Sequence, residues 1–233
     1  MTEPRSESSA DATGSTPRAL VVDYGGVLTS PLDDAMRAWC EGDGIDNAHF
    51  RELMATWLRQ TGPEPSTGTA ANPAYRLERG ELTAAEFERL LASELRSVDG
   101  RALTADGMLR RMFAGFEAVP AMLDVVRRVR AAGHRTALLS NSWGLDYDRT
   151  GWGELFDVTV ISGEVGLRKP EPEIYLLTAD RLGVRPEDCV FVDDLGPNVR
   201  AAEQVGMAAI RHVDPAETIA EIAAHFQLDL AVA

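Results

Sequence analysis

Regular alternation of short apolar runs with longer amphipathic segments is the feature that most constrains the fold of this chain of 233 residues. The runs have the length of buried strands, and the segments between them carry apolar residues at helical spacing. Strands that alternate with helices of about ten residues require crossover connections and therefore pair in parallel. The sequence thus predicts an α/β core with a parallel sheet, whose strands we expect at residues 19–22, 136–139, 158–161, 189–192 and 208–210.

The segment after the first of these runs, residues 33–116, has helical signals and no convincing strand. Thr83 and Glu86 have the spacing of a capping box, and we expect an apolar face on the helix that they begin, formed by Phe87, Leu90, Leu91 and Leu95. The stretch Thr61–Pro73 is polar and rich in Pro and Gly, as expected of a surface loop or of a lid over a site. We therefore predict a helical insertion over 33–116, with the core formed by residues 18–32 and 117–233.

Composition excludes several classes of function. The net charge of −14 disfavours a nucleic-acid partner, because phosphate backbones are bound by clustered Lys and Arg. No apolar run approaches the roughly 20 residues of a membrane span. Residues 1–17 lack the apolar centre of a secretory signal and have the polar composition of a disordered tail. The only cysteines, Cys40 and Cys189, have no zinc-binding spacing, so we expect reduced thiols and a cytoplasmic location.

Polar residues stand where the predicted strands end. Each alone is more often a turn or helix-capping residue, and in "DDLGPN" Asn198 could cap the next helix. Open parallel sheets bind ligands at the carboxyl edge of their strands, where these residues would converge. They are Asp23 after the first strand, Ser140 and Asn141 after the second, Lys169 in the loop after the third, and Asp193 and Asp194 after the fourth.

The chemistry of this set fits phosphoryl transfer. Three carboxylates at one edge would repel each other, and a hard divalent cation such as Mg²⁺ removes that repulsion. Lys169 and Ser140 add a positive charge and a hydroxyl for an anionic substrate. A carboxylate nucleophile, a metal, a lysine and a hydroxyl together indicate a reaction through an aspartyl-phosphate.

Four motifs occur in a fixed order: "DYGGVLT" from Asp23, "LLSNS" with Ser140, "RKPEPEIY" with Lys169, and "VFVDDLGPNVRAAEQVGM" with Asp193 and Asp194. Together they resemble the haloacid dehalogenase superfamily of hydrolases, over residues 18 to about 212. The segment "ERGELTAAEFERLL" also resembles part of the helical cap found after the first motif in many members. The resemblance implies a Rossmann-like core, an α-helical cap domain over the site, and Mg²⁺.

The resemblance also implies a role for each motif residue. Asp23 would be the nucleophile, and Lys169 would orient it and balance the phosphate charge. Ser140 would hydrogen-bond the phosphate, and Asn141 would help to position it. The metal ligands would be Asp23, Asp193, Asp194 and the carbonyl oxygen of Gly25.

The chain departs from the usual phosphatase motif at Gly25, where such enzymes have a second aspartate that acts as general acid and base. A carbonyl there can still bind a metal, but glycine cannot protonate a leaving group or activate water. General acid–base catalysis contributes about 10²–10⁴-fold, or roughly 3–5 kcal/mol of barrier. Members similar to bacterial sugar-phosphate phosphatases also carry glycine there, and an anomeric phosphate leaves readily. We therefore expect a Mg²⁺-dependent hydrolase of small phosphorylated metabolites, sugar phosphates among the candidates, whose substrate and oligomeric state the sequence does not identify.

Two other functions stay open. A metal-independent 2-haloacid dehalogenase would also lack the second aspartate, but Tyr24 lies one position before the tyrosine expected of that class. A non-catalytic or regulatory member that binds a phosphorylated ligand would explain the missing acid, though not the retained Asp23 and Lys169. Asp33 and Asp34 are a weaker hypothesis for a substitute acid, and Trp143 is a candidate for the wall of the pocket.

Overall fold

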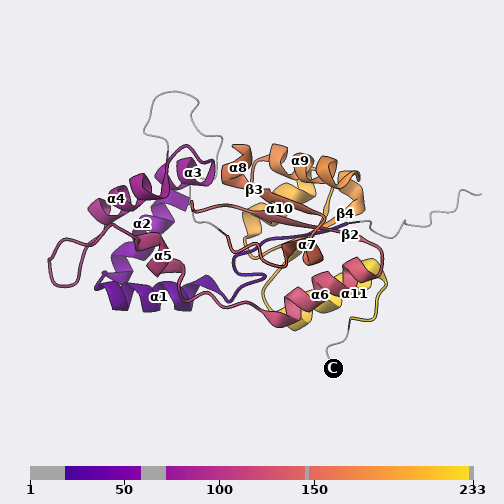
Figure 1. Ribbon diagram of the computed structural model, residues 1–233, viewed down its shortest axis with the longest axis horizontal. Helices are drawn as coiled ribbons and strands as arrows, with labels where there is room; N and C mark the ends of the chain where they lie inside the picture. The colour runs from indigo at the N-terminus through magenta and orange to yellow at the C-terminus, as the bar shows by residue number, and fades with distance from the viewer. Residues whose placement is uncertain (1–18, 59–71, 145–146, 231–233) are drawn as a thin grey trace, which may run out of the picture.

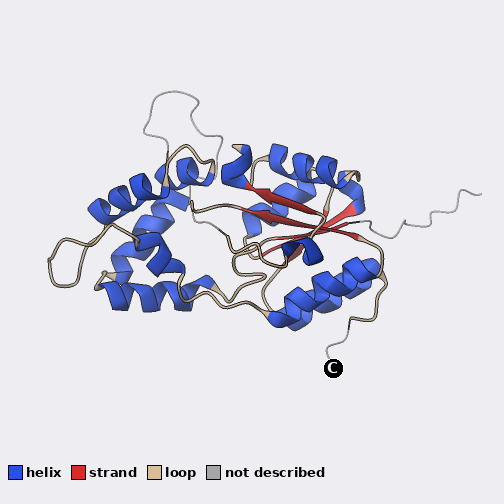
Figure 2. Ribbon diagram, viewed as in Figure 1, coloured by secondary structure: helices blue, strands red, loops and turns tan. Residues whose placement is uncertain are grey.

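The computed structural model describes residues 19–58, 72–144 and 147–230. The predicted tail and most of the stretch Thr61–Pro73 lie outside the described residues. In the described part, five strands form one sheet in the order β3-β2-β1-β4-β5, with every neighbouring pair parallel (Figure 2). The prediction of an α/β core with a parallel sheet is confirmed. The strands are β1 (Ala19–Val22), β2 (Arg135–Ser140), β3 (Val158–Ile161), β4 (Cys189–Asp193) and β5 (Ala208–Arg211).

Helices cover both faces of this sheet (Figure 1). Because successive side chains of a strand point to opposite faces, Leu20 and Val22 pack with α6, α7 and α11, whereas Ala19 and Val21 pack with α9 and α10. The result is a three-layer α/β/α core. Its helical elements are α6 (Pro120–Ala131), α7 (Trp152–Leu155), α8 (Ser162–Val165), α9 (Pro172–Leu182), η1 (Pro186–Asp188), α10 (Gly196–Gln204) and α11 (Pro215–Phe226).

The insertion after β1 is helical, and no named strand occurs among its described residues. It has an apolar cluster of its own, at one end of the molecule in Figure 1. The predicted capping box at Thr83 and Glu86 is present. The expected place of Leu90 on the apolar face is wrong, because its side chain is 39% exposed, while Phe87 and Leu91 are buried. The helices are α1 (Leu32–Asp43), α2 (Asn47–Leu58), α3 (Pro73–Glu78), α4 (Ala84–Glu94) and α5 (Met108–Phe113).

Helix α3 joins this insertion to the core next to β3. The Ser162 hydroxyl donates to the carbonyl oxygen of Glu78 at 2.5 Å, and Gly80 lies so close to Gly163 that a Cβ would be 2.6 Å from its carbonyl oxygen. The carboxylate of Glu78 forms a buried ion pair with Arg168, with Oε2 2.5 Å from Nε. The insertion and the sheet therefore meet through a polar contact beside the loop that carries Lys169.

None of the described helices has both the length and the apolar character needed to cross a lipid bilayer.

Candidate active site

The order of the strands places the candidate site. β1 lies between β2 and β4, so the chain leaves β1 in one direction and returns on its other side, and the crevice at such a reversal is the usual ligand site of an open α/β sheet. Asp23 directly follows β1, and its backbone N–H donates to the carbonyl oxygen of Val192 at 2.9 Å. Asp193 is the last residue of β4. The two carboxylates thus leave adjacent strands at the same edge.

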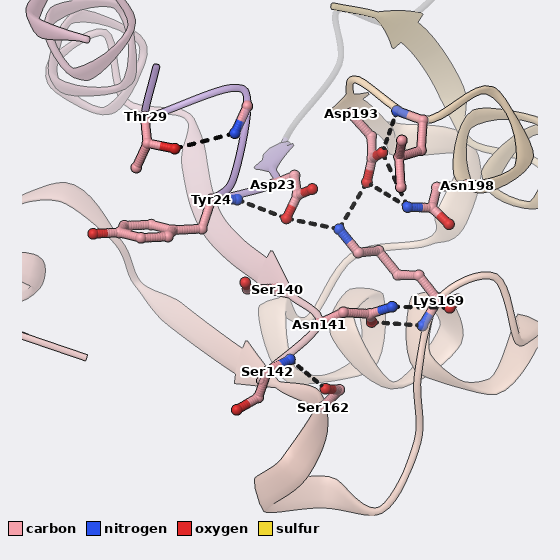
Figure 3. Close-up of polar contacts among 12 residues, drawn as sticks. Asp23, Tyr24, Thr29, Ser140, Asn141, Ser142, Ser162, Lys169, Asp193 and Asn198 are labelled. Carbon is pink, nitrogen blue, oxygen red and sulfur yellow. Dashed lines mark hydrogen bonds and ion pairs between the residues drawn. The ribbon is translucent and has the colours of Figure 1, made fainter. Parts of the chain in front are cut away.

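Lys169 lies between these carboxylates (Figure 3). Its Nζ is 2.8 Å from Oδ1 of Asp23 and 2.7 Å from Oδ2 of Asp193, and its side chain is only 1% exposed. Burial by itself would lower the pKa of Lys169, but the charges of Asp193 and Asp23 outweigh burial and raise it. The lysine is therefore a fixed positive charge at the floor of the site.

The two oxygens of Asp23 have different surroundings. Oδ1 accepts the backbone N–H of Tyr24 at 2.7 Å as well as the ammonium of Lys169. Oδ2 has no hydrogen bond from any residue in the described part of the chain. One oxygen is thus held in place while the other is available to a ligand, as a carboxylate nucleophile requires.

Amide side chains hold the other charged groups. Asn141 accepts the backbone N–H of Lys169 at 2.8 Å and donates to its carbonyl oxygen at 3.0 Å, so it fixes the loop that carries the lysine. Nδ2 of Asn198 donates to both carboxylate oxygens of Asp193, each at 3.0 Å. Asn198 does not cap a helix, since α10 begins at Gly196 after Leu195. The alternative interpretation of "DDLGPN" as a capped turn is wrong on this point.

Asp23, Asp193 and Asp194 form the carboxylate cluster that the sequence suggested. One oxygen of each lies within 4.8 Å of the others. Burial, and then the neighbouring carboxylates, raise the pKa of Asp23, against the opposing effect of Lys169. Burial and the charge of Asp193 raise the pKa of Asp194 to about 6. A single lysine balances one of three negative charges, so this donor set fits a divalent cation, which would balance the other two.

The adjacent glycines after Asp23 differ in the space around them. A Cβ on Gly26 would lie 2.6 Å from Oδ2 of Asp194, and the φ angle of Gly26 is +75°, in the left-handed region that favours glycine. A Cβ on Gly25 would have Leu32 Cδ2, 3.9 Å away, as its nearest neighbour. Gly26 is therefore required for the approach of Asp194, whereas Gly25 leaves room for a side chain.

Above the carboxylates lies a cavity of about 320 Å³. Asp23, Ser140, Lys169 and Asp194 lie among its polar lining residues. The apolar part of its wall comes from both the core and the insertion. This part includes the side chains of Tyr24, Leu32, Phe113, Phe116, Trp143, Tyr147 and Leu195.

Several residues of this site carry no signal in the sequence. Tyr147 forms a hydrogen bond of 3.0 Å with the Ser140 hydroxyl, and burial raises the pKa of its phenol to about 12. Glu78 reaches the cavity from α3 while paired with Arg168, whose guanidinium lies 3.6 Å from the ring centroid of Tyr75. Trp143, the predicted candidate for the wall of the pocket, lines the cavity.

The substitute acids suggested near the first motif receive no support. Asp33 is exposed on α1 and is not among the residues that line the cavity. The side chain of Asp34 lies outside the part of the structure that is described.

Comparison with known proteins gives one family over most of the chain. The model of the haloacid dehalogenase-like hydrolases matches residues 17–206. Mouse acyl-CoA dehydrogenase family member 10 is 28% identical over 228 residues, which cover 91% of this chain and 19% of the mouse protein. Flavin mononucleotide hydrolase 1 of Arabidopsis thaliana is 29% identical over 133 residues, 54% of each chain.

Glyceraldehyde 3-phosphate phosphatase of Methanopyrus kandleri is 32% identical over 104 residues, which cover 42% of this chain and 45% of that protein. The chain thus spans about half the length of the plant and archaeal relatives and about a fifth of the mouse protein. Among solved structures, the HAD family enzyme BT-2542 of Bacteroides thetaiotaomicron, in complex with magnesium and inorganic phosphate, has a TM-score of 0.61. It shares 19% sequence identity, over 84% of this chain and 93% of that one, and so supports the fold.

Proposed function

The chain belongs to the haloacid dehalogenase-like hydrolases, and from this premise we propose that it is a Mg²⁺-dependent phosphatase of small phosphomonoesters. The observation that carries the proposal is the geometry of Asp23. Its Oδ1 is fixed by Lys169 and by the N–H of Tyr24, and its Oδ2 is free among the described residues at a cavity. Two of the relatives are named for phosphate-ester hydrolysis, which supports the same reaction class.

The proposed reaction has two steps. In the first, Oδ2 of Asp23 attacks phosphorus in line, and the bond between phosphorus and the ester oxygen breaks with its electron pair left on that oxygen. In the second, water attacks the aspartyl-phosphate, which releases inorganic phosphate and restores the carboxylate. The carboxylate of Asp23 is thus consumed and regenerated in each turnover.

Three side chains of the chain support these steps. Lys169 opposes the effect of burial on the pKa of Asp23 and holds its Oδ1, and its charge offsets that of the incoming phosphoryl group. Ser140, held by Tyr147, offers a hydroxyl to a phosphate oxygen. Asn141 was expected to position the phosphate, and its contacts favour an indirect route to that end, because both ends of its amide bind the backbone of Lys169.

Asp23, Asp193, Asp194 and the carbonyl oxygen of Gly25 would hold Mg²⁺. The ion would supply charge stabilisation at the phosphoryl oxygens. Asn198 and Lys169 keep Asp193 oriented for this role, since Asn198 donates to both of its carboxylate oxygens and Lys169 contacts Oδ2.

We assign the insertion over residues 33–116 the role of a cap domain on the core of 18–32 and 117–233. Its helices have a separate apolar cluster, and Phe113 and Phe116 bring the insertion to the wall of the cavity. Both cysteines, Cys40 and Cys189, are free thiols, which supports a reducing compartment such as the cytoplasm.

A panel of phosphorylated metabolites, assayed with Mg²⁺ and with chelator while free phosphate and halide are counted in parallel, tests this function. Phosphate release that requires Mg²⁺ is the expected result. Asp23→Asn should abolish it, and Asp33→Asn is the matched control, because Asp33 is exposed and is not among the residues that line the cavity. Chelator-resistant halide release would instead show a dehalogenase. Thermal stabilisation by phosphorylated ligands, without turnover and equal in Asp23→Asn, would show a binding protein.

A further inference from the structure

The wall of the cavity and the absence of an acidic side chain at Gly25 together restrict which phosphate esters can be substrates. Three polar side chains of the cavity beyond the carboxylate cluster are already paired: Asn141 with the backbone of Lys169, Asn198 with Asp193, and Glu78 with Arg168. A sugar phosphate needs free hydrogen-bond partners for its hydroxyls, since burying them without partners is unfavourable. The described lining residues offer few such partners.

The apolar part of the wall has the opposite character. Phe113 and Phe116 of the insertion, and Trp143, which packs against the insertion's apolar cluster, are half-buried rings that line the cavity. Phe113 stands edge-on to the other two, with ring centroids 4.9 Å and 5.9 Å away. Tyr24 and Tyr147 line it from the core, in a T-shaped contact with centroids 5.3 Å apart. Rings with part of their surface free inside a small cavity favour a flat, apolar group, which gains from burial and from ring contacts.

The second restriction is chemical. Gly25 lines the cavity and carries no acid, and among the described lining residues the carboxylates have other partners. Asp23 and Asp194 belong to the cluster, Glu78 pairs with Arg168, and the carboxylate of Asp148 is exposed and accepts the backbone N–H of Thr150 at 3.0 Å. The departing oxygen therefore receives no proton from a positioned carboxylic acid. It leaves readily only if its anion is stable by itself.

We propose that the site selects aryl phosphates, in which the ester oxygen is attached directly to a flat apolar ring, over phosphates of sugars and other alkyl alcohols. This inference rests on the phosphatase function proposed above. As the bond from Asp23 to phosphorus forms, the bond from phosphorus to the ring oxygen breaks, and the electron pair leaves with the aryloxide. The aryloxide then takes a proton from water, so no acid of the chain is needed.

Phenyl phosphate and benzyl phosphate test the inference, because they share the ring and differ in whether the ester oxygen is aryl or alkyl. For the wild-type chain with Mg²⁺ we expect kcat/KM for phenyl phosphate to exceed that for benzyl phosphate by about 10²-fold or more, the size of a missing general acid. Across substituted phenyl phosphates, kcat/KM should rise steeply as the phenol becomes more acidic. Glucose phosphates should be the poorest substrates. Phe116→Ala should raise KM for phenyl phosphate more than it raises KM for glucose phosphates, and so reduce the preference for the aryl ester.

A gain-of-function pair completes the test. Gly25→Asp places a carboxylic acid where the structure has room for a side chain, and Gly25→Asn places a group of the same size that is not an acid. Gly25→Asp should raise kcat/KM for benzyl phosphate at least tenfold and flatten the dependence on phenol acidity, and Gly25→Asn should do neither. Equal wild-type rates on phenyl, benzyl and glucose phosphates would overturn the inference and leave the phosphatase function standing. Failure to release phosphate from any ester, in wild type as in Asp23→Asn, would overturn both.

Discussion

Substitution by alanine should have opposite outcomes at the two glycines after Asp23: it should be tolerated at Gly25 and should disturb the site at Gly26. Gly26→Ala introduces a Cβ 2.6 Å from Oδ2 of Asp194, where ordinary contact begins near 3.4 Å, so the carboxylate must withdraw by about 0.8 Å (3.4 − 2.6). The left-handed φ of +75° adds a backbone penalty of about 1–2 kcal/mol for alanine. Gly25→Ala meets nothing closer than 3.9 Å and no positive φ, so its effect on stability should stay within roughly 0.5 kcal/mol.

Metal binding should suffer more than stability in Gly26→Ala. The atom in the way is the end of a side chain, which moves more easily than backbone, but Mg²⁺ requires near-ideal ligand distances of about 2.0–2.1 Å. We expect a loss of about 1–2 kcal/mol in urea unfolding without metal. We also expect at least a tenfold higher Mg²⁺ concentration for half of the metal-induced rise in Tm.

Gly25→Ala is the control in both measurements and should match the wild-type chain. An unchanged Mg²⁺ requirement in Gly26→Ala would refute the argument that Asp194 binds the metal from its observed position. Equal destabilisation in the two variants would refute the argument from the glycine geometry.

Three further predictions concern the charged groups and the second step of the reaction. Asp23→Asn removes one of the carboxylates that share a single lysine, so metal-free unfolding should show equal or greater stability, and a lower Tm would contradict the account of the cluster. Arg168→Met leaves the carboxylate of Glu78 buried and unpaired and should lower the free energy of unfolding in urea by about 3–5 kcal/mol. Adding Glu78→Gln should recover part of this loss. The same loss in the single and double variants would exclude the ion pair as its cause. Because Gly25 cannot activate water, hydrolysis of the aspartyl-phosphate should be slow, and rapid mixing with an aryl phosphate should give a burst of phenol close to one per active site, whereas linear release from the start would argue against a slow second step.

The sequence was sufficient for the sheet and for the residues at its edge. Apolar runs such as Ala19–Val22 and Cys189–Val192 predict strands from composition alone, and parallel pairing forces their carboxyl ends together. Asp23 and Asp193 could therefore be placed in one site before any coordinates. Lys169 was placed with them by its motif, since the loop that carries it has no periodicity that fixes its position.

Contacts between remote segments were not predictable in this way. Glu78 and Arg168 are 90 positions apart, and their pairing depends on how α3 docks against the core. Asn198 has the composition of a helix cap, and only the start of α10 at Gly196 places its amide on Asp193 instead. The final helix, α11, was not predicted, although Asp214 caps it and Ile219, Ile222 and Phe226 give it a helical apolar face.

The buried pair of Glu78 and Arg168 has a mechanical consequence. Arg168 is covalently joined to Lys169, so a side chain of α3 grips the backbone position next to the amine that touches Asp23. Movement of α3 away from the sheet would break this ion pair. The guanidinium of Arg168 and the carboxylate of Glu78 would then be left without a partner, at a large cost in free energy unless water solvates them. Movement of the insertion away from the core would therefore be coupled energetically to a loosening of Lys169, and so of the contact that holds the proposed nucleophile, Asp23.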